Sequence, residues 1–98
     1  MPDIFKDKFN RSIRLTAERK AHIEEHPEME NQMGKIKETL QTPDFIKCST
    51  FDESVLLFYK KINGYWLCVV TKANVLDGFI ITAYITDKIK EGAMIWEN

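Results

Sequence analysis

The 98-residue sequence has few cysteines and almost no net charge, and these two deficits exclude several classes of protein. Cys48 and Cys68 stand far apart and form no Cys-x-x-Cys motif or Cys/His pair, so we expect reduced thiols rather than a disulfide framework or a zinc ribbon. There are 14 lysines and arginines against 15 acidic residues, a formal net charge of −1. A general affinity for polyanions is therefore excluded, and any nucleic-acid binding has to be local.

Long apolar runs are also missing. No segment approaches the roughly 20 apolar residues that cross a bilayer, and the N-terminal residues lack the apolar stretch of a signal peptide, so we expect a cytoplasmic protein without membrane contact. The chain has no repeat, linker or low-complexity segment, so residues 1–98 are expected to form one domain. Residues 1–10 place a few apolar side chains among charges and could form a docking helix or a loose arm.

Both histidines lie within residues 15–29, the stretch that points most directly to a site. On a helix with about 100° per residue, Arg19, His22, Ile23 and His26 fall within one arc of roughly 100°. Because Ile23 needs burial, this face is predicted to look toward the rest of the protein. It would carry the cationic and titratable side chains to the edge of the core.

Local signals divide the N-terminal half into two helices. Thr16 is a suitable N-cap, so a first helix is predicted over residues 17–25. Pro27 disfavours helical geometry at His26 and suits the first position of a new helix, so the two helices should meet at an angle. An apolar stripe at helical spacing marks the second helix and is assigned to the core: Met29, Met33, Ile36 and Leu40.

The C-terminal half reads as β-structure. Four strands rich in aromatic and β-branched residues are predicted at residues 45–49, 54–61, 65–72 and 78–86. Asn63-Gly64 is a type I′ hairpin signal between the second and third. The predicted fold is α+β, with two N-terminal helices packed on a four-stranded antiparallel meander. A short strand at residues 11–15 precedes the helices, and a tail at residues 92–96 could add an edge strand.

Alternation along the last long strand predicts which side chains are open to solvent. Phe79, Ile81, Ala83 and Ile85 form a wholly apolar side that the second helix should cover. Thr82, Tyr84 and Thr86 would then line the opposite face, where three hydroxyls in register could hold phosphate oxygens or a base. The alternative is a solvated sheet face with threonine chosen for β-propensity.

These motifs, taken in order, resemble a known family. The segments are residues 14–23 (RLTAERKAHI), 26–29 (HPEM), Pro43-Asp44, 77–84 (DGFIITAY) with Thr86, and Gly92 with Ile95-Trp96. Together they look like the small phage- and plasmid-associated domains grouped with barnase, EndoU, the colicin RNases and the RelE-type toxins. The resemblance implies two N-terminal helices on a four-stranded antiparallel sheet, and metal-independent RNA cleavage in active members. It implies a toxin-like or phage-related setting.

Such cleavage needs a base for the 2′-hydroxyl, cations for the phosphoryl oxygens and an acid for the departing 5′ oxygen. His22 is the candidate general acid or base, because histidine titrates near neutral pH. Arg19 is the candidate phosphate clamp, and Tyr84 the candidate stacking or proton-relay group. Thr82 and Thr86 are candidate phosphate ligands.

Three further residues are candidates for substrate binding: Lys60, His26 and Arg14. Lys60 is a possible second cation that should share a sheet face with Leu56 and Phe58. His26 is held as a substitute for His22. A difficulty is that Thr82, Tyr84 and Thr86 point away from the helices, so His22 would reach them only around a sheet edge or a twisted corner.

A metal site is the weaker interpretation of the histidine pair. His22 and His26 have the i, i+4 spacing of paired zinc ligands. Ile23 stands where metalloproteases carry glutamate, however, and no third ligand is evidently placed, so we expect neither metal nor cofactor. A purely structural role is also open for His22, hydrogen-bonded between helix and sheet.

The expected partner is RNA, and a neutralising antitoxin or another protein partner is possible. The rival function is a non-catalytic module that binds RNA or a protein through the same sheet face. The slight net acidity favours that rival, whereas the His/Arg helix face favours an endoribonuclease.

Overall fold

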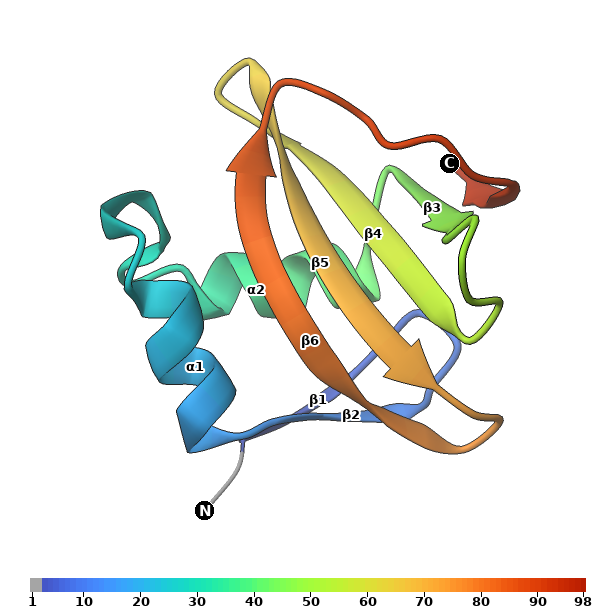
Figure 1. Ribbon diagram of the computed structural model, residues 1–98, viewed down its shortest axis with the longest axis horizontal. Coiled ribbons are helices and arrows are strands. Elements are labelled where there is room, and N and C mark those ends of the chain that lie inside the picture. The colour runs from blue at the N-terminus through green and yellow to red at the C-terminus, as the bar shows by residue number, and fades with distance from the viewer. Residues whose placement is uncertain (1–2) are drawn as a thin grey trace.

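The computed structural model of the protein describes residues 3–98 and contains one mixed β-sheet with two α-helices (Figure 1). The strands are β1 (Asp3–Lys6), β2 (Ser12–Leu15), β3 (Phe45–Cys48), β4 (Val55–Ile62), β5 (Tyr65–Ala73), β6 (Asp77–Thr86) and β7 (Met94–Glu97). The helices are α1 (Ala17–Glu24) and α2 (Met33–Gln41), with the short 3-10 helix η1 (Pro27–Met29) between them. The predicted α+β class is confirmed. Among residues 3–98, no helix has the length and apolar character needed to span a membrane.

The sheet is larger than the predicted four-stranded meander. Its seven strands follow the order β1-β2-β6-β5-β4-β3-β7. β2 and β6 pair in parallel, whereas every other neighbouring pair is antiparallel. The prediction was wrong because residues 3–6 form a strand rather than a docking helix or a loose arm, and because β2 joins the sheet between β1 and β6 instead of standing apart from it. The tail does pair with β3 as an edge strand, and residues 1–2 lie outside the described part of the chain.

The first helix forms where local sequence predicts it. The Thr16 hydroxyl accepts a hydrogen bond from the Arg19 backbone N–H at 3.2 Å, which satisfies one of the free amides at the helix N-terminus. Pro27 opens η1 with His26 as its N-cap residue. A continuous second helix from Pro27 is wrong, because Asn31 adopts φ 60° and separates η1 from α2.

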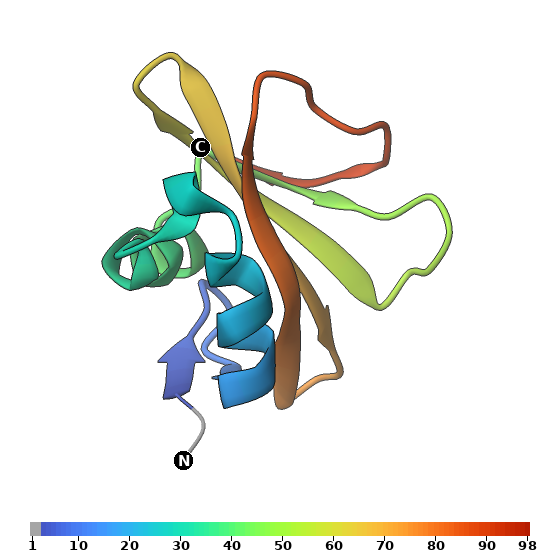
Figure 2. The same ribbon diagram turned by 60° about the vertical axis from the view of Figure 1, so that its left-hand side comes forward.

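One face of the sheet packs on the helices, as Figure 2 shows edge-on. The apolar stripe of the second helical segment is core: Met29, Ile36 and Leu40 are fully buried. They pack with buried side chains of the sheet, namely Ile13, Leu15, Ile46, Leu56, Phe58, Leu67, Val69, Ile80 and Ala83. Ile23 is the buried residue of α1.

A β-bulge in β6 changes which of its side chains face the helices. Val70 pairs with Thr82 but Thr71 pairs with Ile80, so Ile81 is an extra residue in the ladder. At the bulge, the alternation of side chains between the two faces of the sheet shifts by one residue. Ile80 is fully buried against the helices, whereas Ile81 packs on the opposite face. The prediction is therefore correct for Ala83 and wrong for Ile81, because strict alternation does not survive a bulge.

The segment between β6 and β7 closes tightly over β3. A Cβ built on Gly92 would lie 2.1 Å from the Cys48 carbonyl oxygen, so only glycine allows the two backbones to approach this closely. This contact holds residues 87–93 beside the face of the sheet that the helices leave uncovered.

Candidate functional site

We call the sheet surface opposite α2 the open face. A second apolar cluster occupies it, with Leu57, Tyr59, Cys68 and Val70 buried. Half-buried side chains surround this cluster: Phe45, Val55, Trp66, Ile81 and Tyr84. The open face is therefore an apolar surface rather than the solvated threonine-rich face that the alternative predicted.

A cavity of about 640 Å³ lies on the open face. Strands β4, β5 and β6 supply apolar side chains to it, including Leu57, Val70 and Ile81. Polar groups come from the end of β6 and the segment after it: Thr82, Tyr84, Lys90 and Glu91. Residues 49–51 complete the lining, and the Phe51 side chain is 97% exposed. An apolar hollow with a few polar groups suits a flat organic ring such as a nucleobase.

The loop that brings Phe51 to the cavity is fixed by Asp52. Its carboxylate accepts hydrogen bonds from the Ser54 hydroxyl at 2.7 Å and the Ser54 amide at 2.9 Å, and lies 3.1 Å from Lys72 Nζ. The Ser54 hydrogen bonds, followed by the attraction of Lys72, lower the pKa of Asp52 to about 2. This carboxylate therefore remains charged at neutral pH and ties the β3–β4 loop to β5.

Two tyrosines beside the cavity have different hydrogen bonding. The Tyr59 hydroxyl accepts a hydrogen bond from the Lys90 backbone N–H at 3.1 Å, whereas the buried Tyr84 hydroxyl lies beside the Cys68 thiol, a weak hydrogen-bonding group, and has no oxygen or nitrogen partner within residues 3–98. Burial raises the pKa of Tyr59 to about 12 and raises that of Tyr84 further. Burial also raises the pKa of the Cys68 thiol, to about 11. All three groups are therefore protonated at neutral pH. Of the two roles predicted for Tyr84, stacking and proton relay, this favours stacking by its ring, which lines the cavity.

Helix α1 lies beside the edge of β6, as Figures 1 and 2 agree. β2 pairs with β6 only as far as Phe79, so beyond it this edge has no strand partner among residues 3–98. Figure 1 looks onto the open face with α1 at this border.

The two flanks of α1 differ in burial. At about 100° per residue, Lys20 and Glu24 lie to one side of Ile23, and Arg19 and His22 lie to the other. Lys20 and Glu24 are half-buried, whereas Arg19 and His22 are exposed. The sequence placed Arg19 and His22 at the edge of the core, and both lie on the more exposed flank of the helix, beside the buried Ile23.

The environment of His22 is open and polar. Its Nδ1 lies 3.1 Å from the Glu25 carboxylate, and the two side chains are 59% and 71% exposed. A carboxylate on one ring nitrogen leaves the other nitrogen directed elsewhere, which is the usual arrangement of a histidine that exchanges protons. His26 is likewise exposed, at the cap of η1. Within residues 3–98, neither histidine side chain forms a hydrogen bond that joins a helix to the sheet.

The remaining predicted residues lie in four separate places. Thr82 and Tyr84 share the cavity, but Thr86 closes a turn, with its hydroxyl accepting from the Lys88 amide at 3.1 Å. Lys60 shares the face of Leu56 and Phe58, as predicted, yet that face packs on the helices. Its ammonium donates to the Thr42 carbonyl at 2.7 Å, away from the open face.

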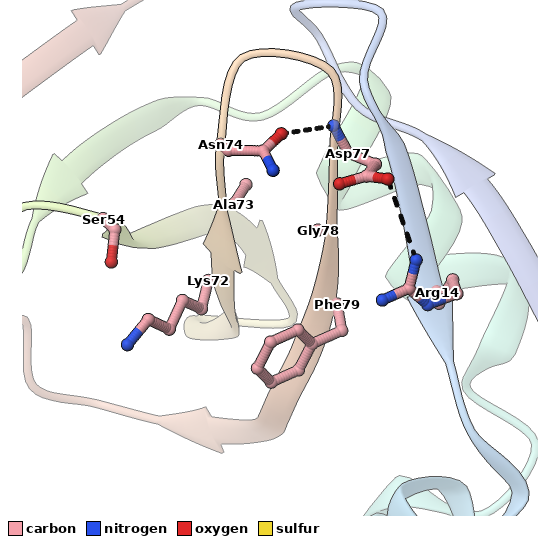
Figure 3. A pocket seen from close by; sticks show the side chains of 8 residues that line it. All are labelled: Arg14, Ser54, Lys72, Ala73, Asn74, Asp77, Gly78 and Phe79. Carbon is pink, nitrogen blue, oxygen red and sulfur yellow. Dashed lines mark hydrogen bonds and ion pairs between the residues drawn. The ribbon is translucent and has the colours of Figure 1, made fainter.

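Arg14 lies at the far end of the open face, beside the β5–β6 hairpin. Its guanidinium is 3.9 Å from Asp77, and both border a second cavity of about 310 Å³ with Lys72 and Phe79 (Figure 3). Sequence reasoning missed Lys72, Phe79 and Lys90. Phe79 was assigned to the helical side by strict alternation, and only knowledge of the bulge could have corrected it.

The described residues contain no group of three or more histidine, cysteine, aspartate or glutamate side chains placed to hold a metal ion. Comparison with known proteins adds no relative: no family model, curated protein or solved structure matches the chain.

Proposed function

We propose that the chain is an endoribonuclease that cleaves RNA without a metal ion, with its reaction centre where α1 meets the unpaired edge of β6. The observation that carries the proposal is the exposed Arg19/His22 flank of α1, a helix that packs on β6. A histidine and an arginine one helical turn apart supply a proton-transfer group and a fixed cation. RNA laid across this border would meet both groups.

The chemistry assigns one role to each group. The 2′-oxygen attacks the neighbouring phosphorus while its proton passes to a base, and the bond from phosphorus to the 5′ oxygen breaks as that oxygen receives a proton. The products are a 2′,3′-cyclic phosphate and a free 5′-hydroxyl. His22 performs one of the two proton transfers, oriented by the Glu25 carboxylate at 3.1 Å. Arg19 neutralises the charge that grows on the phosphoryl oxygens.

The test is cleavage of an end-labelled mixed-sequence RNA by purified protein in EDTA, with the product ends analysed. Wild type is expected to leave 2′,3′-cyclic phosphates. His22→Ala should lose about 10²- to 10⁴-fold in rate, the usual contribution of one general acid or base. Lys20→Ala is the matched control, because it removes a cation from the opposite flank of the same helix. Equal cleavage by all three proteins would identify a contaminating nuclease and contradict the proposal.

A second candidate is a non-catalytic RNA-binding module. The observation that favours it is that the 640 Å³ cavity is lined by no histidine, so its polar groups suit binding rather than proton transfer. Binding of labelled RNA by wild type, unchanged in His22→Ala and without cleavage over long incubation, would favour this candidate.

A further inference from the structure

The hairpin end of the open face carries an aromatic ring between two cations. Arg14 on β2 and Lys72 on β5 both pair with Phe79 on β6, so the three residues lie side by side in one row across the sheet. Neighbouring strands are about 4.8 Å apart, so the two cationic residues lie about 10 Å from each other with the ring between them. Figure 3 shows all three side chains bordering the 310 Å³ cavity.

The Phe79 ring borders the cavity. Among residues 3–98, no cationic group lies over it and no other aromatic ring stacks on it. The rings of the two tryptophans differ in this respect, since Lys61 Nζ lies 5.1 Å from the ring centre of Trp66 and Lys8 Nζ lies 3.9 Å from that of Trp96. A half-buried phenylalanine that borders a cavity is a platform for a flat partner.

Each of the two cations that flank the Phe79 ring forms an ion pair with a carboxylate. Lys72 Nζ lies 3.1 Å from Asp52, and Arg14 Nη1 lies 3.9 Å from Asp77. The second pair is long and about half exposed, so it contributes little stability. A phosphate can accept two parallel hydrogen bonds from the guanidinium and would replace Asp77 readily.

We propose that this row is a subsite for single-stranded RNA, in which Phe79 stacks one base and Arg14 and Lys72 hold the phosphates on either side of it. The inference rests on the proposed function and adds a second contact to the strand, separate from the reaction centre at α1. Stacking on an aromatic ring needs an unstacked base, so the subsite selects single strands over duplexes.

The test uses a fluorescent single-stranded oligonucleotide of roughly 12 nucleotides with 2′-O-methyl groups, which has no 2′-hydroxyl to attack. Phe79→Leu keeps the apolar bulk but removes the flat ring, and should weaken binding about 5- to 100-fold at an unchanged melting temperature. Phe79→Trp should retain or tighten it. Arg14→Gln and Lys72→Gln should each reduce the slope of log affinity against log salt by about 0.7.

Asp77→Asn is a variant that should strengthen oligonucleotide binding, whereas the variants above, Phe79→Trp excepted, should weaken it or its salt dependence. Removing the carboxylate frees Arg14 for phosphate, so this variant should bind the oligonucleotide more tightly than wild type. Wild-type affinity in Phe79→Leu, together with an unchanged salt slope in Arg14→Gln and Lys72→Gln, would overturn the subsite. If RNA is still cleaved in a His22-dependent way, the proposed function survives that result. A wild-type protein that neither binds nor cleaves RNA would overturn both.

Discussion

The two tyrosines with buried hydroxyls on the open face should respond in opposite directions to the same substitution. Tyr84→Phe removes a buried hydroxyl that has no oxygen or nitrogen partner within residues 3–98 and lies beside the weakly bonding Cys68 thiol. Burying a hydroxyl unpaired costs about 1–3 kcal/mol, so its removal should raise the free energy of unfolding by about 1 kcal/mol. For a domain of this size, that corresponds to a melting temperature about 4–8 °C higher.

Tyr59→Phe is the matched control. Its hydroxyl accepts the Lys90 backbone N–H at 3.1 Å, so the substitution leaves that amide unpaired. We expect a loss of about 1 kcal/mol. Urea unfolding followed by fluorescence measures both variants, with equal m-values as evidence that the same two-state transition is observed. A Tyr84→Phe protein less stable than wild type would show that the hydroxyl has a bonding partner and would refute the reasoning.

Two further predictions concern carboxylates outside the proposed reaction centre. Asp7 has a fully buried side chain that accepts from Arg11 Nε at 2.8 Å, from the Arg11 amide at 2.9 Å and from the Phe9 amide at 3.0 Å. Asp7→Ala leaves Arg11 without its partner and should cost about 3–5 kcal/mol in urea unfolding, whereas a loss below about 1 kcal/mol would contradict the importance of this pair. Asp52 has a pKa lowered from 3.8 to about 2, so its contribution to stability is complete above about pH 4 and is lost as the pH falls through 2. Thermal unfolding between pH 2 and pH 5 should therefore show a weaker pH dependence in Asp52→Asn, and identical profiles for variant and wild type would show that the Ser54 and Lys72 contacts of the Asp52 carboxylate have no effect on stability.

Features that depend on short-range chemistry could be predicted from the sequence. The Thr16 cap and the start of the first helix are examples, because the hydroxyl bonds to an amide three residues later. The β4–β5 hairpin is another: Asn63 and Gly64 adopt φ 47° and 83°, the two positive values of a type I′ turn.

Features that depend on long-range packing could not be predicted. The bulge at Ile81 arises from pairing between β5 and β6 and leaves no local sign, so it moved Phe79 and Ile81 to the open face against the expected alternation. Burial of Ile23 was correctly predicted, but the exposure of the side chains on either side of it depends on tertiary packing. The sequence placed His22 at the edge of the core, and the structure leaves its side chain 59% exposed.

The central claim is that His22 transfers a proton in RNA cleavage, and one rate comparison tests it most directly. Single-turnover cleavage of a defined single-stranded RNA in EDTA would be measured for wild type, His22→Ala and Lys20→Ala at matched concentration. The account predicts wild-type rates for Lys20→Ala and a loss of about 10²- to 10⁴-fold for His22→Ala. A His22→Ala protein that cleaves as fast as wild type, with the same cyclic phosphate ends, would contradict it.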